Sequence, residues 1–154
     1  MRSTSLAVIY QINSRSEISD QVTYCLGIEF IQDEEGILMH QKGYLLDILQ
    51  RFGILDSKPV STLLESGTKL KKASSTEEES FPYKELLGAL MYLAICFRPD
   101  IAYSVSYLSQ FANYYDSTHW IVAKRVLRYL KATADNGLFY RKTSLPLRDY
   151  VDTD

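Results

Sequence analysis

The sequence has no long apolar run, few cysteines and histidines, and almost no excess charge. No stretch of its 154 residues approaches the roughly 18–20 consecutive apolar residues that span a bilayer, so no membrane-spanning helix is expected. Neither His40 nor His119 has a cysteine near it, which argues against a zinc site and favours buried, reduced thiols at Cys25 and Cys96. A formal net charge of −2 supplies no overall basic field that would recruit nucleic acid.

The N-terminal segment indicates a secretory signal only weakly. Arg2 precedes an apolar run over residues 6–10, which is shorter than the about 7–15 residues of a signal-peptide core. Residues 1–23 are otherwise polar and without a clear period. We therefore expect a poorly ordered N-terminal segment over 1–23 and one structured unit over 24–154.

Hydrophobic periodicity predicts an α+β fold with an N-terminal β-hairpin, a helical middle of three to four helices and a C-terminal strand pair. The expected strands are residues 24–31, 37–39, 137–141 and 147–152, and the expected helices are residues 41–52, 83–97, 99–113 and 118–132. The 83–97 helix is apolar on nearly every side, which places it at the centre of a core over residues 83–132. Residues 54–80 are expected to be a loop, poorly ordered from residue 65 onward.

The last expected helix carries a row of basic residues. Lys124, Arg128 and Lys131 recur at positions i, i+4 and i+7, and Arg125 lies beside them. Such a row can follow a phosphate backbone, or it can be the solvated face of a helix that packs through its other side. The expected inner face consists of Trp120, Ala123, Leu127 and Leu130. This basic row is the sequence's candidate face for nucleic acid or for a protein partner.

Two carboxylates follow an apolar strand near residue 150. Side chains alternate along a strand, so Asp152 and Asp154 would point to one face, as in half of a two-metal nuclease site. Two Mg²⁺ ions about 4 Å apart need several more carboxylates, and two carboxylates alone leave an ion mostly to water. We therefore expect no bound metal, no cofactor and no catalytic residue.

Several blocks of sequence resemble one family. They are residues 26–30 (LGIEF), 41–49 (QKGYLLDIL), 59–62 (PVST), 83–93 (YKELLGALMYL), 98–101 (RPDI), 119–120 (HW), 124–131 (KRVLRYLK) and 150–154 (YVDTD). In this order and spacing, residues 24–154 resemble the Pol polyprotein of Ty1/copia-type retrotransposons, between the reverse transcriptase palm and the RNase H domain. Two positions depart from the family pattern: Leu63 stands where a proline is expected, and Ala132 where a glycine is expected.

The resemblance implies a role for each part of the chain. Residues 24–39 would correspond to the primer-grip hairpin, the helices up to about residue 132 to the thumb and connection, and Asp152 to the first RNase H carboxylate. Residues 1–23 hold no paired aspartates of a polymerase site, and the other RNase H carboxylates would lie beyond Asp154. Because both reactions depend on metal ligands, we expect neither polymerisation nor RNA cleavage from these residues.

A second resemblance concerns residues Arg125, Val126, Leu127 and Arg128. They fit the R-x-L-R pattern of secreted effectors from oomycete plant pathogens, although the acidic Glu-Glu-Arg of that family is absent. As a free-standing chain the sequence is similar to such an effector. This implies a non-enzymatic protein that is secreted, enters the host cytoplasm or nucleus and, through an unknown host plant protein, suppresses defence and cell death. The alternative is a catalytically inert, intracellular relic of a retrotransposon polyprotein with at most residual nucleic-acid binding.

Overall fold

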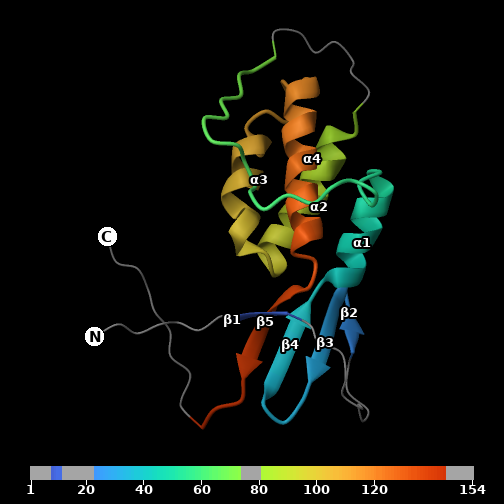
Figure 1. Cartoon of the computed structure of the whole chain (residues 1–154), viewed down its shortest axis with the longest axis vertical. Coiled ribbons are helices and arrows are strands. Elements are labelled where there is room, and N and C mark those ends of the chain that lie inside the picture. The colour runs from blue at the N-terminus through green and yellow to red at the C-terminus, as the bar shows by residue number, and fades with distance from the viewer. Residues whose placement is uncertain (1–7, 12–22, 74–80, 145–154) are drawn as a thin grey trace, which may run out of the picture.

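The computed structural model describes residues 8–11, 23–73 and 81–144. Figure 1 shows the helices gathered at one end of the molecule and the strands at the other. In chain order the elements are β1 (Val8–Gln11), β2 (Tyr24–Cys25), β3 (Ile28–Gln32), β4 (Gly36–His40), α1 (Lys42–Arg51), α2 (Tyr83–Cys96), the 3₁₀ turn η1 (Pro99–Ile101), α3 (Ala102–Ser109), α4 (Ser117–Ala132) and β5 (Asn136–Arg141). The predicted α+β class is confirmed.

The strands form one antiparallel sheet in the order β1-β5-β4-β3-β2. The expected hairpin is present as β3 and β4. Its turn is closed by Asp33, whose Oδ1 accepts hydrogen bonds from the backbone N–H groups of Glu35 at 2.8 Å and Gly36 at 2.9 Å. An aspartate that binds backbone groups two and three residues later is a local turn signal, which explains why the sequence located this hairpin.

The expected continuous strand over residues 24–31 is wrong. Leu26 and Gly27 have φ angles of 51° and 77°, in the left-handed region that strand residues do not occupy. The chain reverses there, and Tyr24 and Cys25 pair back onto β3. The alternation of apolar and polar residues continues through the turn, so periodicity alone missed it. Gly27 was the signal for a two-residue hairpin turn with positive φ.

β5, the first strand of the expected C-terminal pair, lies inside the sheet. Phe139 is paired with Leu38 of β4 on one side and with Val8 of β1 on the other, so both edges of β5 are occupied by strands from early in the chain. The second expected strand, residues 147–152, lies outside the described residues. Val8–Gln11 form a strand inside the segment that we expected to be poorly ordered.

The four expected helices are present close to their predicted bounds, with one exception. The expected helix over residues 99–113 is divided into the 3₁₀ turn η1 and the shorter α3. At the end of α3 the Ser109 hydroxyl donates to the Val105 carbonyl at 2.8 Å, a side-chain bond that competes with the backbone ladder. No helix within the described ranges is long and apolar enough to cross a membrane.

The helices share one apolar core centred on α2, as its composition predicted. The residues of α2 that are buried are Tyr83, Leu86, Leu87, Leu90 and Leu93. They pack against Leu45, Ile48 and Leu49 of α1, Val105 and Leu108 of α3, and Ala123, Val126, Leu127 and Leu130 of α4. This core fixes the orientation of α4 and therefore determines which of its side chains reach the surface.

Candidate nucleic-acid or partner interface

α4 carries the candidate face and begins at a well-formed N-cap. Asp116 Oδ1 accepts hydrogen bonds from the backbone N–H groups of Thr118 at 2.9 Å and His119 at 3.3 Å. The hydrogen bond from the Thr118 hydroxyl, followed by those from His119, lowers the pKa of Asp116 to about 2. An ionised carboxylate at a helix N-terminus also interacts favourably with the helix dipole. The start of α4 is thus well defined.

The inner face of α4 is the one that the sequence predicted. Trp120 is 9% exposed, and Ala123, Leu127 and Leu130 are fully buried. His119 is buried as well, between Tyr83 and Phe111. With these side chains turned to the core, the basic residues of α4 lie on its outer side.

The basic row binds the segment that follows α1. We call residues 54–73 the strap; Figure 1 shows it crossing α4. Arg128 Nε donates to the Lys58 carbonyl at 2.7 Å, and Lys131 Nζ donates to the Ser57 carbonyl at 2.8 Å. These two cations therefore satisfy backbone carbonyls of a segment that has no regular secondary structure.

The other two basic residues of α4 also have intramolecular partners. Arg125 pairs with the Glu65 carboxylate at 2.8 Å and donates to the Thr62 hydroxyl at 2.8 Å. The Lys124 ammonium lies 5.6 Å from the centre of the Trp120 ring. The row is therefore more than a solvated helix face, because three of its four cations hold the strap in place.

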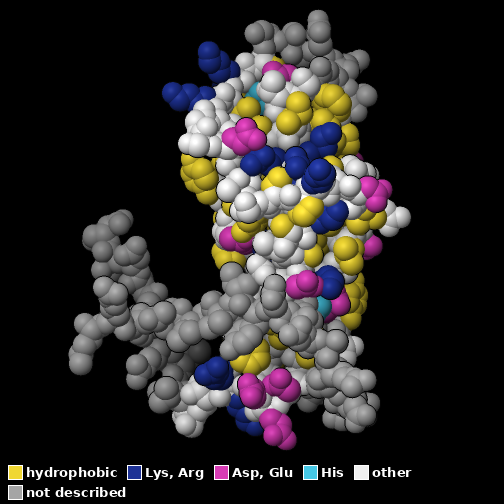
Figure 2. All heavy atoms as spheres, in the orientation of Figure 1, with side chains coloured by type: hydrophobic (Ala, Val, Ile, Leu, Met, Phe, Trp, Pro, Cys, Tyr) yellow, Lys and Arg dark blue, Asp and Glu magenta, His cyan; other side chains and the backbone are white. Residues whose placement is uncertain are grey.

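The surface formed by α4 and the strap remains basic in spite of these contacts. The two segments carry Lys58, Lys69, Lys71 and Lys72 in addition to the four basic residues of α4, against only Asp56 and Glu65. All four strap lysines are exposed. Figure 2 shows lysine and arginine side chains gathered across this face. The chain thus has a local positive field that its net charge of −2 conceals.

The quartet Arg125, Val126, Leu127 and Arg128 is not an accessible linear segment in this fold. Val126 and Leu127 are 0% exposed, in the middle of α4. Both arginines are engaged with the strap. A receptor could read the four residues as a peptide only if α4 unwound and lost its core contacts.

A polar network that sequence reasoning missed joins the end of α2 to the end of α4. Arg98 is 5% exposed and binds Asp100 through Nε at 3.0 Å and Nη2 at 2.8 Å. It also donates to the Thr133 carbonyl at 3.1 Å, and the Tyr129 hydroxyl donates to Asp100 at 3.0 Å. Burial tends to raise the pKa of Asp100, but the hydrogen bonds and charge of Arg98 outweigh it, and the pKa is lowered. The signal available in the sequence was the block Arg-Pro-Asp.

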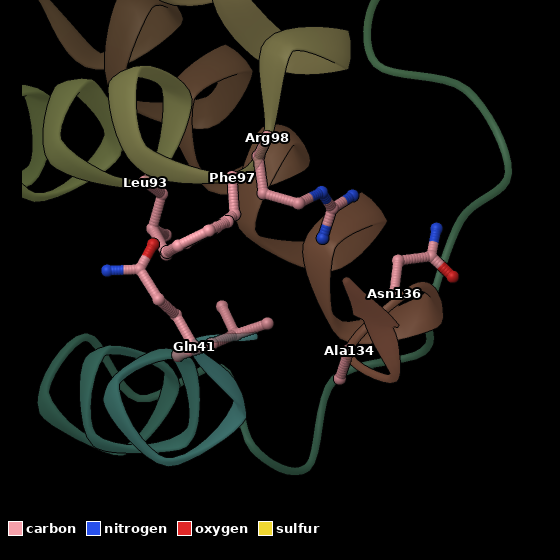
Figure 3. Close-up of a pocket in the computed structure, with 7 residues that line it drawn as sticks. Gln41, Leu93, Phe97, Arg98, Ala134 and Asn136 are labelled. Atoms are coloured by element: carbon pink, nitrogen blue, oxygen red, sulfur yellow. The ribbon is translucent and has the colours of Figure 1, made fainter. Parts of the chain in front are cut away.

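A small cavity lies beside this network. Figure 3 shows Gln41 before α1, Arg98 after α2, and Ala134 and Asn136 before and in β5 around it. Its volume is about 10 Å³, which is the space of a single water molecule. The cavity is therefore too small to be a substrate or cofactor site.

The two carboxylates of the sequence analysis, Asp152 and Asp154, lie outside the described residues. Within residues 8–11, 23–73 and 81–144, no group of three or more histidine, cysteine or acidic side chains is arranged to hold a metal ion. The candidate site of the described part is therefore the basic surface of α4 and the strap.

The sequence is similar to several known proteins. The chain is 39% identical over 137 residues, 88% of its length, to the retrovirus-related Pol polyprotein from transposon RE2 of Arabidopsis thaliana, of which the match covers 9%. It is 36% identical over 152 residues to an uncharacterized mitochondrial protein of the same plant, a match that covers 96% of this chain and 62% of that protein. It is 47% identical over 77 residues, 49% of this chain and 54% of the relative, to secreted RxLR effector protein 161 of Plasmopara viticola.

These matches differ in how much of this chain and of each relative they cover. The chain spans only about a tenth of the length of the Pol polyproteins that it matches, but nearly all of it is aligned to them. The match to the effector covers half of the chain. No family model matches the sequence, and no solved structure gives a significant match.

Proposed function

We propose, from the homology of this chain to one segment of the Pol polyproteins of Ty1/copia-type retrotransposons, that it is a non-catalytic Pol segment that binds a nucleic-acid backbone weakly. Identities of 34–39% over 84–93% of the chain support the polyprotein origin. The observation that carries the binding proposal is the concentration of basic side chains on α4 and the strap.

The contacts that the basic row makes with the strap limit the hydrogen bonds that it can offer to a nucleic acid. Arg125, Arg128 and Lys131 already donate to groups of the strap, so they contribute to the field while offering few free hydrogen bonds. Lys69 and Lys71 are exposed and have no such partner within the described part of the chain. We therefore expect contacts to phosphates through the strap lysines, without reading of the base sequence.

A salt titration with charge-neutralising variants tests the binding proposal. The probe is a fluorescent 20-base-pair RNA–DNA hybrid, and the readout is the slope of log affinity against log salt concentration. Each lysine that contacts a phosphate contributes about −0.9 to this slope, so replacing Lys69, Lys71 and Lys72 by glutamine should reduce it by about three units. Lys142→Gln, at the far end of the sheet, is the matched control and should leave the slope unchanged.

Two outcomes contradict the binding proposal. One is a triple variant with the slope of the wild-type chain. The other is a loss in Lys142→Gln of about one third of that in the triple variant, which would mean that only total charge matters. Circular dichroism of each variant establishes that the helices are retained.

The absence of catalysis is the second part of the proposal. It rests on the described residues, among which no group of three or more histidine, cysteine or acidic side chains is arranged to hold the metal ions that both reactions need. Template-primer extension and cleavage of an RNA–DNA hybrid, each with Mg²⁺, should show no activity above buffer. Activity that disappears on Asp152→Asn would contradict it.

An effector function is a second candidate, favoured by the 47% identity to a protein named as a secreted RxLR effector. In that case the chain would be secreted and would act in a host plant cell through a protein partner. The burial of Val126 and Leu127 means that a folded surface, and not the quartet as a peptide, would make the contact.

Expression inside plant leaf cells tests this second candidate, because it bypasses uptake. The wild-type chain should reduce elicitor-triggered cell death, and Asp152→Asn with Asp154→Asn should leave the effect intact. Leu90→Asp should abolish it, since an unpaired charge in a fully buried position unfolds the core. A well-expressed wild-type chain that leaves cell death unchanged against several elicitors would eliminate the candidate.

A further inference from the structure

A groove with a charge opposite to that of the α4 surface lies between the sheet and α1. The strand register pairs Tyr24 with Glu29 and Glu29 with His40, so the three side chains form a row across β2, β3 and β4 on one face of the sheet. α1 packs over this face, where the Gly43 N–H donates to Glu29 Oε1 at 2.7 Å. The row is the floor of the groove, and the first turns of α1 form its wall.

The groove is large enough to receive a side chain, and its lining is acidic and aromatic. It has a volume of about 550 Å³, and the residues that line it include the acidic Glu29 and Asp47 and the aromatic Tyr24 and Tyr44. No lysine or arginine of the described residues lines it. Tyr24 is 64% exposed, so its ring is available to an incoming group.

The lysine and arginine at the two ends of α1 form ion pairs with carboxylates outside the groove. Lys42 at the start of α1 pairs with Asp135 at 2.5 Å. Arg51 at the end of α1 pairs with Glu85. His40 does not compensate either, because burial lowers its pKa and favours the neutral ring, in spite of the adjacent Glu29.

We propose that this groove binds an arginine or lysine side chain from an extended basic segment of a partner protein. Glu29 and Asp47 would form the ion pairs, and the tyrosine rings would contact the cation through their faces. The same carboxylates repel phosphates, so the groove and the basic surface of α4 select partners of opposite charge. The inference stands independently of nucleic-acid binding, because it uses different residues on a different part of the fold.

Peptide binding to charge variants tests this inference. The probe is a capped, fluorescent triarginine peptide, with triglutamate as the reference, and the readout is fluorescence anisotropy at low salt. Glu29→Gln keeps an acceptor for the Gly43 N–H, and Asp47→Asn is exposed, so both variants should fold. Each should weaken triarginine binding about two- to fivefold, as expected for an ion pair at a partly exposed site.

The matched control is Glu34→Gln, which removes one exposed carboxylate from the β3–β4 turn and should have no effect. In amide NMR spectra the peptide should shift Gly43 and Tyr24 more than residues of that turn. Equal weakening by Glu34→Gln would overturn the proposal, and so would triarginine binding no tighter than triglutamate. A single-stranded oligonucleotide that shifts Gly43 and loses affinity in Glu29→Gln would also overturn it.

Discussion

Replacing Arg98 by methionine should destabilise the chain far more than replacing an exposed arginine. Arg98 is 5% exposed and holds Asp100 and Thr133 through four hydrogen bonds. Methionine fills similar space but leaves the Asp100 carboxylate and the Thr133 carbonyl without their donor. Removing one partner of a buried ion pair costs about 3–5 kcal/mol, and Asp100 remains 24% exposed, so we expect about 2–4 kcal/mol.

Arg51→Met is the control for the effect of Arg98→Met on stability. Arg51 also joins two helices, through Glu85, but its side chain is 63% exposed and that of Glu85 44%. An exposed ion pair contributes at most about 1 kcal/mol to stability. Urea unfolding followed by the fluorescence of Trp120, the single tryptophan, measures both variants on one scale. The thermal midpoint should fall by roughly 5–15 °C for Arg98→Met.

The pH dependence gives an independent check of the Arg98 prediction. The pKa of Asp100 is lowered in the folded chain, so its pairing stabilises the fold above the unfolded value of about 3.9 and is lost as pH falls through the folded value. The difference between wild type and Arg98→Met should therefore narrow below about pH 4. Adding Asp100→Asn to Arg98→Met should cost less than the sum of the single changes. Equal losses for Arg98→Met and Arg51→Met would refute the reasoning.

Two further predictions concern single positions of the fold. Gly137→Ala should destabilise the fold by about 1–3 kcal/mol, because the added Cβ would lie 2.6 Å from the Met39 carbonyl oxygen of the neighbouring strand. Gly88→Ala in α2 should stabilise the fold by about 0.5–1 kcal/mol, because the added Cβ would meet no atom within 4 Å and alanine favours the helix over glycine. Thermal unfolding measures both, and a stabilising Gly137→Ala would contradict the sheet register. Asp116→Ala should cost about 1 kcal/mol through loss of the cap, while Asp116→Asn should largely retain it. Because the folded pKa of Asp116 is about 2, the advantage of wild type over Asp116→Asn should be present above about pH 3.9 and disappear as pH falls through 2.

The sequence predicted the structure best where the structure depends on residues close to one another in the chain. The buried faces of α2 and α4 follow directly from the spacing of Leu86, Leu90, Ala123 and Leu127. The β3–β4 hairpin follows from its turn residues. Such patterns need no knowledge of the rest of the chain, which is why α2, α4 and the turn between β3 and β4 were predicted correctly.

The sequence was least informative where distant segments meet. The partners of β5 are strands from the other end of the chain, and nothing local to residues 136–141 specifies them. The basic residues of α4 were identified, but their carbonyl partners could not be, because the strap has no period from which its path can be derived. The same holds for the row of Tyr24, Glu29 and His40, which exists only through strand register.

The central place of β5 has a consequence for the order in which the sheet can be built. β3 and β4 join through a short turn and can pair as soon as both have been synthesised. β1 and β4 are never neighbours, because β5 separates them, so β1 has no sheet partner until residues 136–139 leave the ribosome. Closing so long a loop slows folding, and until then β4 exposes an unpaired edge. The nascent chain is thus most open to mispairing in the interval between synthesis of β4 and arrival of β5.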